Sequence, residues 1–265
     1  MSFIKGHYVP TCYLRRFTNG GGSTDKLFVF DRGRGKWPSS PKKAGCEVGM
    51  YAVAGHPTPD LFETSMGEDL ESRWGPMLLE ISQSRMLPTG EEWSGFLGFV
   101  AIAILRSPRF KNWQAQLDAA TPPYIPTPPE SYVYDMVTNV KPMMKALRLR
   151  TWTVLASPPE APDFICSDNP VNIAPTKSGV DMRGFVPLYQ PDTIITVPID
   201  RRTAVAGLFE AVVVRTNRTT VASINYATGN YARQVYAATP DFEWLTPDQK
   251  YATADEWLAH YGKRD

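Results

Sequence analysis

The chain has 265 residues, 43% of them hydrophobic and 12% aromatic, which is enough to bury a sizeable core. Its 28 Lys and Arg almost balance its 27 Asp and Glu, and this balance argues against a protein that works mainly as a non-specific nucleic-acid binder. The 3 cysteines are widely spaced, so they support neither a disulfide framework nor a structural zinc site. Reduced thiols in a cytoplasmic protein are the simplest interpretation.

The chain shows no signal for membrane insertion or export. Its start, MSFIK, lacks the apolar stretch of a signal peptide. The most apolar run, residues 93–105, ends at Arg106 and is shorter than the roughly 20 apolar residues that a membrane span requires. We therefore expect no membrane segment and interpret this run as a buried helix.

The opening segment, residues 6–17, predicts an extended entry followed by a short helix. Pro10 suits a first helical turn, where its missing N–H costs nothing. Three apolar side chains then share one face of the helix: Tyr13, Leu14 and Phe17.

Strands are expected next. Residues 26–31 form an alternating apolar run, residues 32–36 a Gly-rich turn, and Trp37 begins the return arm of a hairpin. A further short strand is expected over residues 50–53.

The middle of the chain predicts three helices. The first covers residues 60–86 and should be bent or cut at its Gly75-Pro76 pair. The second covers residues 89–119, with a kink at Ser107-Pro108, and the third covers residues 130–147. The Pro-rich residues 121–129 mark the one candidate lobe boundary. We interpret them as a loop within a single domain, residues 1–265.

The second half changes to a period of two. Strands are expected over residues 151–156, 164–167, 193–199, 203–209 and 211–215. A last amphipathic helix should start near Asn217 and carry apolar residues as far as Val235. The fold class is therefore α+β, with a helical middle section packed on a mostly antiparallel sheet of N-terminal and C-terminal strands.

Several signatures of known chemistry are absent from the sequence. It contains no phosphate-binding GxxxxGK[ST] loop, no GxGxxG after a strand, no HExxH and no GxSxG. Nucleoside-triphosphate and dinucleotide chemistry are therefore not expected.

His7 is the candidate general base. It lies just before a helix N-terminus and two arginines, and this positive setting disfavours its protonated form. The alternative is that His7 donates a hydrogen bond that holds the N-terminal strand.

The Ser-Asp-Asn-Pro turn, residues 167–170, follows a strand that should be buried. Asp168 could orient His7 or bind a metal, and Asn169 could hold a substrate. The alternative is an Asx-turn that ends the strand.

Carboxylates on the first middle helix form a third candidate. Glu68 and Glu71 share a face, and Glu63 lies about two turns from Glu71. Such a pair could do acid–base work or bind a divalent cation, so a cation is one option although no metal-ligand motif is present; a solvated helix surface is the alternative.

Three further polar residues are candidates for binding a substrate. Arg106, at the end of the most apolar helix, needs a carboxylate partner or a bound anion. Arg15 lies in the opening helix, and Asn225 is an amide among the apolar positions of the last helix.

The same segments carry a resemblance to a family. The opening HYVPTCYLRRF, residues 7–17, resembles that of the mainly bacterial family called domain of unknown function 4238. Later landmarks occur in the same order: Tyr51, Glu63, Glu71, Arg106 before Ser-Pro, the Ser-Asp-Asn-Pro turn, Pro187-Leu188 and Asn225. The family has no settled activity, and the resemblance implies that His7, Arg106, Asp168 and Asn225 occur as a set that converges in space.

Two functions follow as hypotheses. The first is a hydrolase acting on a phosphate-containing substrate such as nucleic acid, in a toxin or phage-defence setting, with His7 as base, Asp168 and Glu71 as further catalytic groups, and Arg15 and Arg106 holding the anion. The second is a non-catalytic binding module, in which the same residues form a buried polar network that fixes the fold. Convergence on an open cleft favours the first; dry, mutually satisfied side chains favour the second.

Overall fold

Antiparallel pairing organises the strands into three sheets. The computed structural model describes residues 5–51, 61–65, 70–120, 130–177, 180, 186–211, 216–230 and 232–242. One sheet has two strands in the order β1-β4, and two sheets have four, in the orders β3-β2-β10-β6 and β5-β9-β8-β7. The first four-stranded sheet combines strands from both ends of the chain.

The strands are β1 (Lys5–His7), β2 (Leu27–Asp31), β3 (Gly35–Ser39), β4 (Cys46–Val48), β5 (Thr151–Ala156), β6 (Cys166–Ser167), β7 (Asn172–Pro175), β8 (Thr193–Asp200), β9 (Thr203–Leu208) and β10 (Gln234–Ala237). The helices are α1 (Thr11–Leu14), the 3₁₀ turn η1 (Arg15–Phe17), α2 (Leu61–Ser65), α3 (Ser72–Ser84), α4 (Gly90–Leu105), α5 (Pro108–Ala120), α6 (Glu130–Leu147), α7 (Val186–Tyr189) and α8 (Arg218–Asn230).

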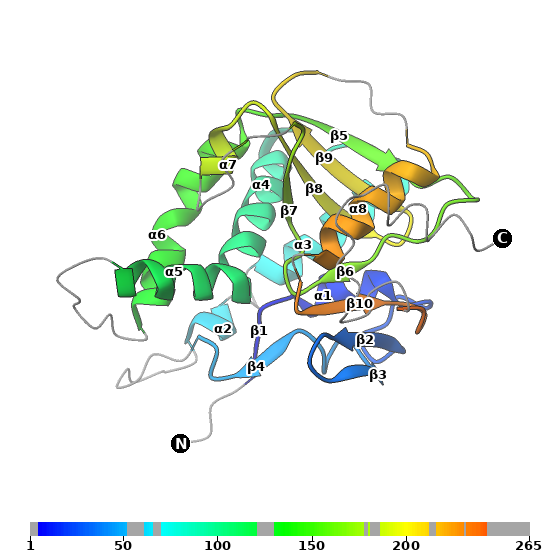
Figure 1. Ribbon diagram of the computed structural model, residues 1–265, viewed down its shortest axis with the longest axis horizontal. Helices are drawn as coiled ribbons and strands as arrows, with labels where there is room; N and C mark the ends of the chain where they lie inside the picture. The colour runs from blue at the N-terminus through cyan, green and yellow to red at the C-terminus, as the bar shows by residue number, and fades with distance from the viewer. Residues whose placement is uncertain are drawn as a thin grey trace.

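The helices form a block beside the sheets, except α8, which packs on both four-stranded sheets (Figure 1). Ala222 of α8 joins Phe30 and Val235 of one sheet, and Val221 joins Leu155 of the other. α4 and α6 run antiparallel, since the Tyr132 hydroxyl at one end of α6 donates to the carbonyl of Leu105 and Arg148 at the other end donates to Ser94. This arrangement confirms the predicted α+β class.

α4 forms the centre of the helical block because it is apolar on every side, which a helix tolerates only when it is surrounded by other elements. It ends at Arg106, whose N–H still donates to the carbonyl of Ile102. The hydroxyl of Ser107 then accepts from the N–H of Phe110, and Pro108 occupies the first position of α5. The kink predicted at Ser107-Pro108 is therefore a complete helix end followed by a capped helix start.

Most expected elements are confirmed: the short helix after Pro10, the hairpin around residues 32–36, the helix over 130–147, the strands near 151–156, 193–199 and 203–209, and a final helix capped by Asn217. The strand expected over 164–167 is shortened to β6. The Gly75-Pro76 pair was predicted to bend or to cut its helix. α3 runs through both residues without a break, so the helix is not cut there.

Two predicted elements are wrong. The strand expected over residues 50–53 is not formed at Met50 and Tyr51, which lie in a turn after β4, and residues 52 and 53 lie outside the described part of the chain. The last helix ends at Asn230, and Val235 belongs to strand β10. Val235 continues the helical spacing by coincidence, since it lies beyond the end of α8.

Some predictions fall outside the described residues, namely the lobe boundary at 121–129, most of the strand expected at 211–215, and Glu68. Short elements β7 and α7 were not predicted. In the described part of the chain, no helix is both long and apolar enough to cross a membrane.

Candidate functional site

Two polar networks surround the opening segment. The first, here called the Arg106 network, contains His7, Tyr51, Glu63, Glu71 and Arg106. The second, here called the Gln234 network, contains Tyr8, Asp31, Asp168, Gln234 and Tyr236. Of the predicted site residues, His7, Glu71 and Arg106 lie in the first network and Asp168 lies in the second.

In the Arg106 network, side chains bind the backbone of strand β1. The N–H of His7 donates to Glu63 Oε1 at 2.9 Å, and the carbonyl of His7 accepts a hydrogen bond from Arg106 Nη2. Glu63 Oε2 and Arg106 Nη2 form an ion pair at 3.4 Å. An antiparallel strand would offer the same acceptor and donor to one residue of its neighbour. The ion pair therefore takes the place of a further strand beside β1 and closes its edge.

Arg106 is fully buried, and all three nitrogens of its guanidinium have partners. Nε donates to the Tyr51 hydroxyl at 3.2 Å, Nη1 lies 3.3 Å from Glu71 Oε1, and Nη2 reaches Glu63 and the His7 carbonyl. Tyr51 also lies under the guanidinium, 5.3 Å from ring centre to Cζ. A buried cation needs such pairing, since desolvation alone costs several kcal/mol. The arrangement favours the structural ion pair over a phosphate-binding role for Arg106.

The charges of this network follow from burial. Burial alone would lower the pKa of Arg106, but Tyr51, Glu71 and Glu63 raise it overall, so the guanidinium stays charged. Burial raises the pKa of the Glu71 carboxyl, against the opposing effect of Arg106. Burial also raises the pKa of Tyr51 to about 12, which keeps its phenol protonated at neutral pH. Two carboxylates facing one guanidinium give a site that disfavours an anionic substrate.

The imidazole of His7 lies at the edge of the network. Its Nδ1 is 3.6 Å from Glu63 Oε1, close enough for an ion pair but too long for a hydrogen bond, and its Nε2 is 3.4 Å from the Lys42 carbonyl. The side chains of His7, Glu63 and Glu71 are 19%, 14% and 16% exposed, in contrast to Arg106 at 0%. Among the residues that the structure describes, no group of three or more His, Cys, Asp or Glu is arranged to hold a metal ion.

The Gln234 network joins β10 to its neighbours. Gln234 Nε2 donates to Asp31 at 2.9 Å, and Gln234 Oε1 accepts from the hydroxyls of Tyr8 at 3.1 Å and Tyr236 at 2.9 Å. Asp168 directly follows the neighbouring strand β6, and its carboxylate accepts hydrogen bonds from the backbone N–H groups of Arg233 at 3.2 Å and Gln234 at 3.1 Å. The hydrogen bonds of Asp168 thus go to β10, whereas the ring nitrogens of His7 face Glu63 and Lys42.

Burial raises the pKa of Asp168 to about 6, although the hydrogen bonds that its carboxylate accepts from two backbone N–H groups act in the opposite direction. The turn after β6 is closed by Ser167, whose hydroxyl donates to the Asn169 carbonyl at 2.9 Å and accepts from the Asn169 N–H at 3.2 Å. An Asx-turn by Asp168 would need an N–H on Pro170, which has none, so that alternative is wrong. Asn169 is tied into this turn through its backbone.

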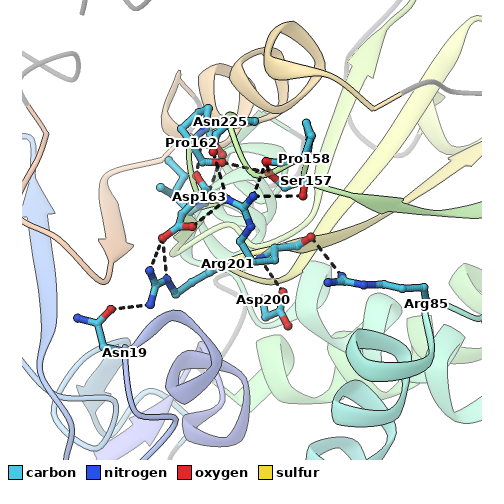
Figure 2. A network of polar contacts seen from close by, with 12 residues as sticks. Asn19, Arg85, Ser157, Pro158, Pro162, Asp163, Asp200, Arg201 and Asn225 are labelled. Carbon is cyan, nitrogen blue, oxygen red and sulfur yellow. Dashed lines mark hydrogen bonds and ion pairs between the residues drawn. The ribbon is translucent and has the colours of Figure 1, made fainter. Parts of the chain in front are cut away.

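Asn225 and Arg15 lie apart from the two networks' hydrogen bonds. Asn225 Nδ2 donates to the Asp163 carbonyl at 2.8 Å, and Oδ1 accepts from the Ile165 N–H at 3.2 Å. Figure 2 shows it among the contacts that Arg201 makes with Asp163, where it fixes the chain before β6. A substrate role for Asn225 is therefore not favoured.

Arg15 is half-buried and lies against α3, where a Cβ on Gly75 would come within 3.2 Å of its Nη2. Beside it, burial and then Glu71 raise the pKa of the Cys12 thiol to about 12, with Arg15 acting in the opposite direction. Cys12 is thus not a thiolate nucleophile at neutral pH. Arg15 has no ion pair among the described residues, and its substrate role stays a prediction.

The sequence did not single out Glu63 or Gln234 for the roles they have here. Glu63 was one of three carboxylates on its helix and a landmark of the family resemblance, but neither signal placed it beside β1. Gln234 fell within the predicted last helix, so its pairing with Asp31 across β2 and β10 could not be foreseen.

The fold and the two networks define an α+β protein whose N-terminal segment is held by buried polar side chains. Residues 5–124 match the family model described as "Protein of unknown function (DUF4238)", which confirms the resemblance of the opening segment. The match contains the whole Arg106 network and ends before the Ser-Asp-Asn-Pro turn and β10. Comparisons with curated proteins and with solved structures gave no match.

Proposed function

We propose that this chain is a non-catalytic, partner-binding module in which both networks hold the opening segment in place. The observation that carries the proposal is the saturation of Arg106, which is 0% exposed and bound on every nitrogen by Tyr51, Glu63, Glu71 and the His7 carbonyl. Asp168 supports it, because both of its carboxylate oxygens accept backbone N–H groups. Groups used in this way are part of the folded structure and are not free to bind a substrate.

The part of His7 that the network binds is its backbone. Glu63 accepts a hydrogen bond from the His7 N–H, and Arg106 donates to the His7 carbonyl. Among the described residues, the imidazole has only the 3.6 Å approach to Glu63 and the 3.4 Å approach to the Lys42 carbonyl. Any residue with a backbone N–H could be held in the same way. This favours a structural role for the segment over general-base catalysis.

The second candidate is the hydrolase acting on a phosphate-containing substrate such as nucleic acid, in a toxin or phage-defence setting. The observation in its favour is the partly exposed group formed by His7, Glu63 and Glu71. In this version Glu63, rather than Asp168, would orient the His7 imidazole as general base. The excess of carboxylates over Arg106 weighs against it for an anionic substrate.

A cleavage assay separates the two candidates. The purified chain is incubated with labelled single-stranded and double-stranded RNA and DNA, with Mg²⁺, Mn²⁺ or EDTA, beside the His7→Ala variant. We expect no cleavage by either protein above a mock purification. Cleavage by the wild type that is lost in His7→Ala, with an unchanged melting temperature, would overturn the proposal in favour of the hydrolase.

A further inference from the structure

The solvent face of α6 carries cations and large apolar side chains together. Its exposed residues recur three and four apart, which places them on one side of the helix. Together with two exposed residues of the turn that follows the helix, they form what we call the α6 stripe: Tyr134, Val137, Thr138, Lys141, Pro142 and Lys145 of α6, and Arg148 and Leu149 of the turn. None of these eight residues is acidic.

The apolar members of the stripe are unusually exposed. Tyr134, Val137 and Leu149 are 70%, 55% and 57% exposed. The solvent face of a helix in a globular protein is normally polar. The solvent face of α3 follows this rule more closely, with Arg73 and Glu80 supplying both signs of charge. The α6 stripe therefore combines one sign of charge with apolar surface, as docking surfaces do.

Pro142 removes one backbone donor from the middle of the stripe. A proline inside a helix lacks the N–H that would donate to the carbonyl four residues earlier. Here that carbonyl belongs to Thr138, and both residues are exposed. A partner could donate to it in the middle of the stripe.

The positive charge at the centre of the stripe comes from Lys141 and Lys145, because the charged residues near its ends contact other helices. Asp135 is turned towards α5, where it accepts from the side chain of Gln114. Arg148 donates to Ser94 of α4 at 2.9 Å, so α4 fixes that end. Lys141 and Lys145 are exposed and one turn apart between the apolar residues.

We propose that the α6 stripe docks an acidic amphipathic segment of a partner protein, an inference that rests on the proposed function of a binding module. Carboxylates of such a segment would face Lys141 and Lys145, and its apolar residues would cover Val137 and Tyr134. Nucleic acid fits less well, because it would leave Val137 and Leu149 in water and because the chain's 28 basic and 27 acidic residues give it no attracting field.

Selection from a displayed library of random peptides tests this chemistry without knowledge of the partner. The library is selected against the wild type and then against two variants: Lys141→Glu with Lys145→Glu, and the matched control Arg34→Glu with Lys43→Glu, which reverses two exposed charges elsewhere. We expect enriched peptides that combine Asp or Glu with apolar residues, and whose synthetic copies bind the first variant at least tenfold more weakly and the control unchanged.

Further variants and ligands test the apolar and the charged parts of the stripe separately. Val137→Ser should weaken the selected peptides, and peptides with Lys in place of Glu should bind the Lys141→Glu, Lys145→Glu variant. No enrichment, or enriched peptides indifferent to both changes in the stripe, would overturn the inference. Stronger binding of a single-stranded oligonucleotide than of any selected peptide, lost in the same variant, would also overturn it. The outcome of the cleavage assay does not depend on these peptide measurements, so failure of this inference can be distinguished from failure of the proposed function.

Discussion

The two networks hold adjacent residues of the same segment by opposite means. At His7, charged side chains from α2 and α4 bind backbone groups, and a buried cation lies at the centre. At Tyr8, a neutral amide lies at the centre, and one carboxylate, Asp168, binds the backbone of β10. The first network depends on charges that must match one another, whereas the second depends on hydrogen bonds around Gln234. This difference predicts different responses to mutation and to pH.

The largest effect is expected at Arg106. Arg106→Leu should destabilise the fold by about 3–5 kcal/mol, because it leaves two partly buried carboxylates, Glu63 and Glu71, together without a cation. The measurement is the free energy of unfolding in urea. Adding Glu63→Gln and Glu71→Gln to Arg106→Leu should recover part of the loss, because the unpaired charges are removed. A triple variant less stable than the single one would show that charge pairing is not what the network contributes.

The Gln234 network should respond to pH through Asp168. The pKa of Asp168 in the folded protein, about 6, lies above its ordinary value of 3.8, so the folded state holds the proton more tightly. Its contribution to stability is therefore full below pH ~4 and is lost as pH rises to ~6, by up to ~3 kcal/mol for a shift of about two pH units. Urea unfolding from pH 4 to 7 should show this fall for the wild type relative to Asp168→Asn. Parallel profiles for the two proteins would contradict the prediction.

His7 tests whether the Arg106 network binds backbone or side chain. His7→Pro should cost about 2 kcal/mol, since it removes the N–H that Glu63 accepts and leaves a partly buried carboxylate with one bond fewer. His7→Ala keeps that N–H and should cost ~1 kcal/mol or less. Thermal melts of the two variants provide the comparison, and equal losses would mean that the imidazole, not the backbone, is what the network holds.

Two tyrosine hydroxyls, one in each network, provide the most direct comparison, with the smaller effect expected at Tyr8. Tyr51→Phe removes an acceptor from the charged Nε of Arg106 and should cost about 1.5–3 kcal/mol. Tyr8→Phe removes a neutral bond to Gln234, which still accepts from Tyr236, and should cost about 0.5–1.5 kcal/mol. The free energies of unfolding of both variants in urea show which loss is larger. A larger loss for Tyr8→Phe would contradict the distinction between a network centred on a cation and one centred on a neutral amide.

The sequence predicted the parts of the fold that depend on local pattern. The break at Ser107-Pro108 and the start of α8 at Asn217 follow from capping chemistry, which acts within a few residues. Tyr13, Leu14 and Phe17 were placed on one apolar face and are all buried. The sequence also predicted that Arg106 would have a carboxylate partner or a bound anion, because a cation at the end of an apolar helix must be paired with a negative charge.

What the sequence could not supply was pairing over long distances. Asp168 and His7 were expected to meet, but they belong to different networks because Asp168 faces β10, a strand that was assigned to the last helix. Glu63 was passed over in favour of Glu71, since nothing in the local pattern reveals that Glu63 faces the edge of β1. Both errors concern contacts more than 50 residues apart in the chain.

The position of β10 has a consequence for how the chain is made. Asp31 and Gln234 are 203 residues apart in the sequence, yet they lie on paired strands. At a synthesis rate of about 5–20 residues per second, the β2–β3 hairpin waits roughly 10–40 s on the ribosome before β10 emerges. During that time β2 presents an open edge together with Phe28 and Phe30, which later pack near α8. The β3-β2-β10-β6 sheet is therefore completed among the last steps of folding, and until then the β2–β3 hairpin is exposed to aggregation.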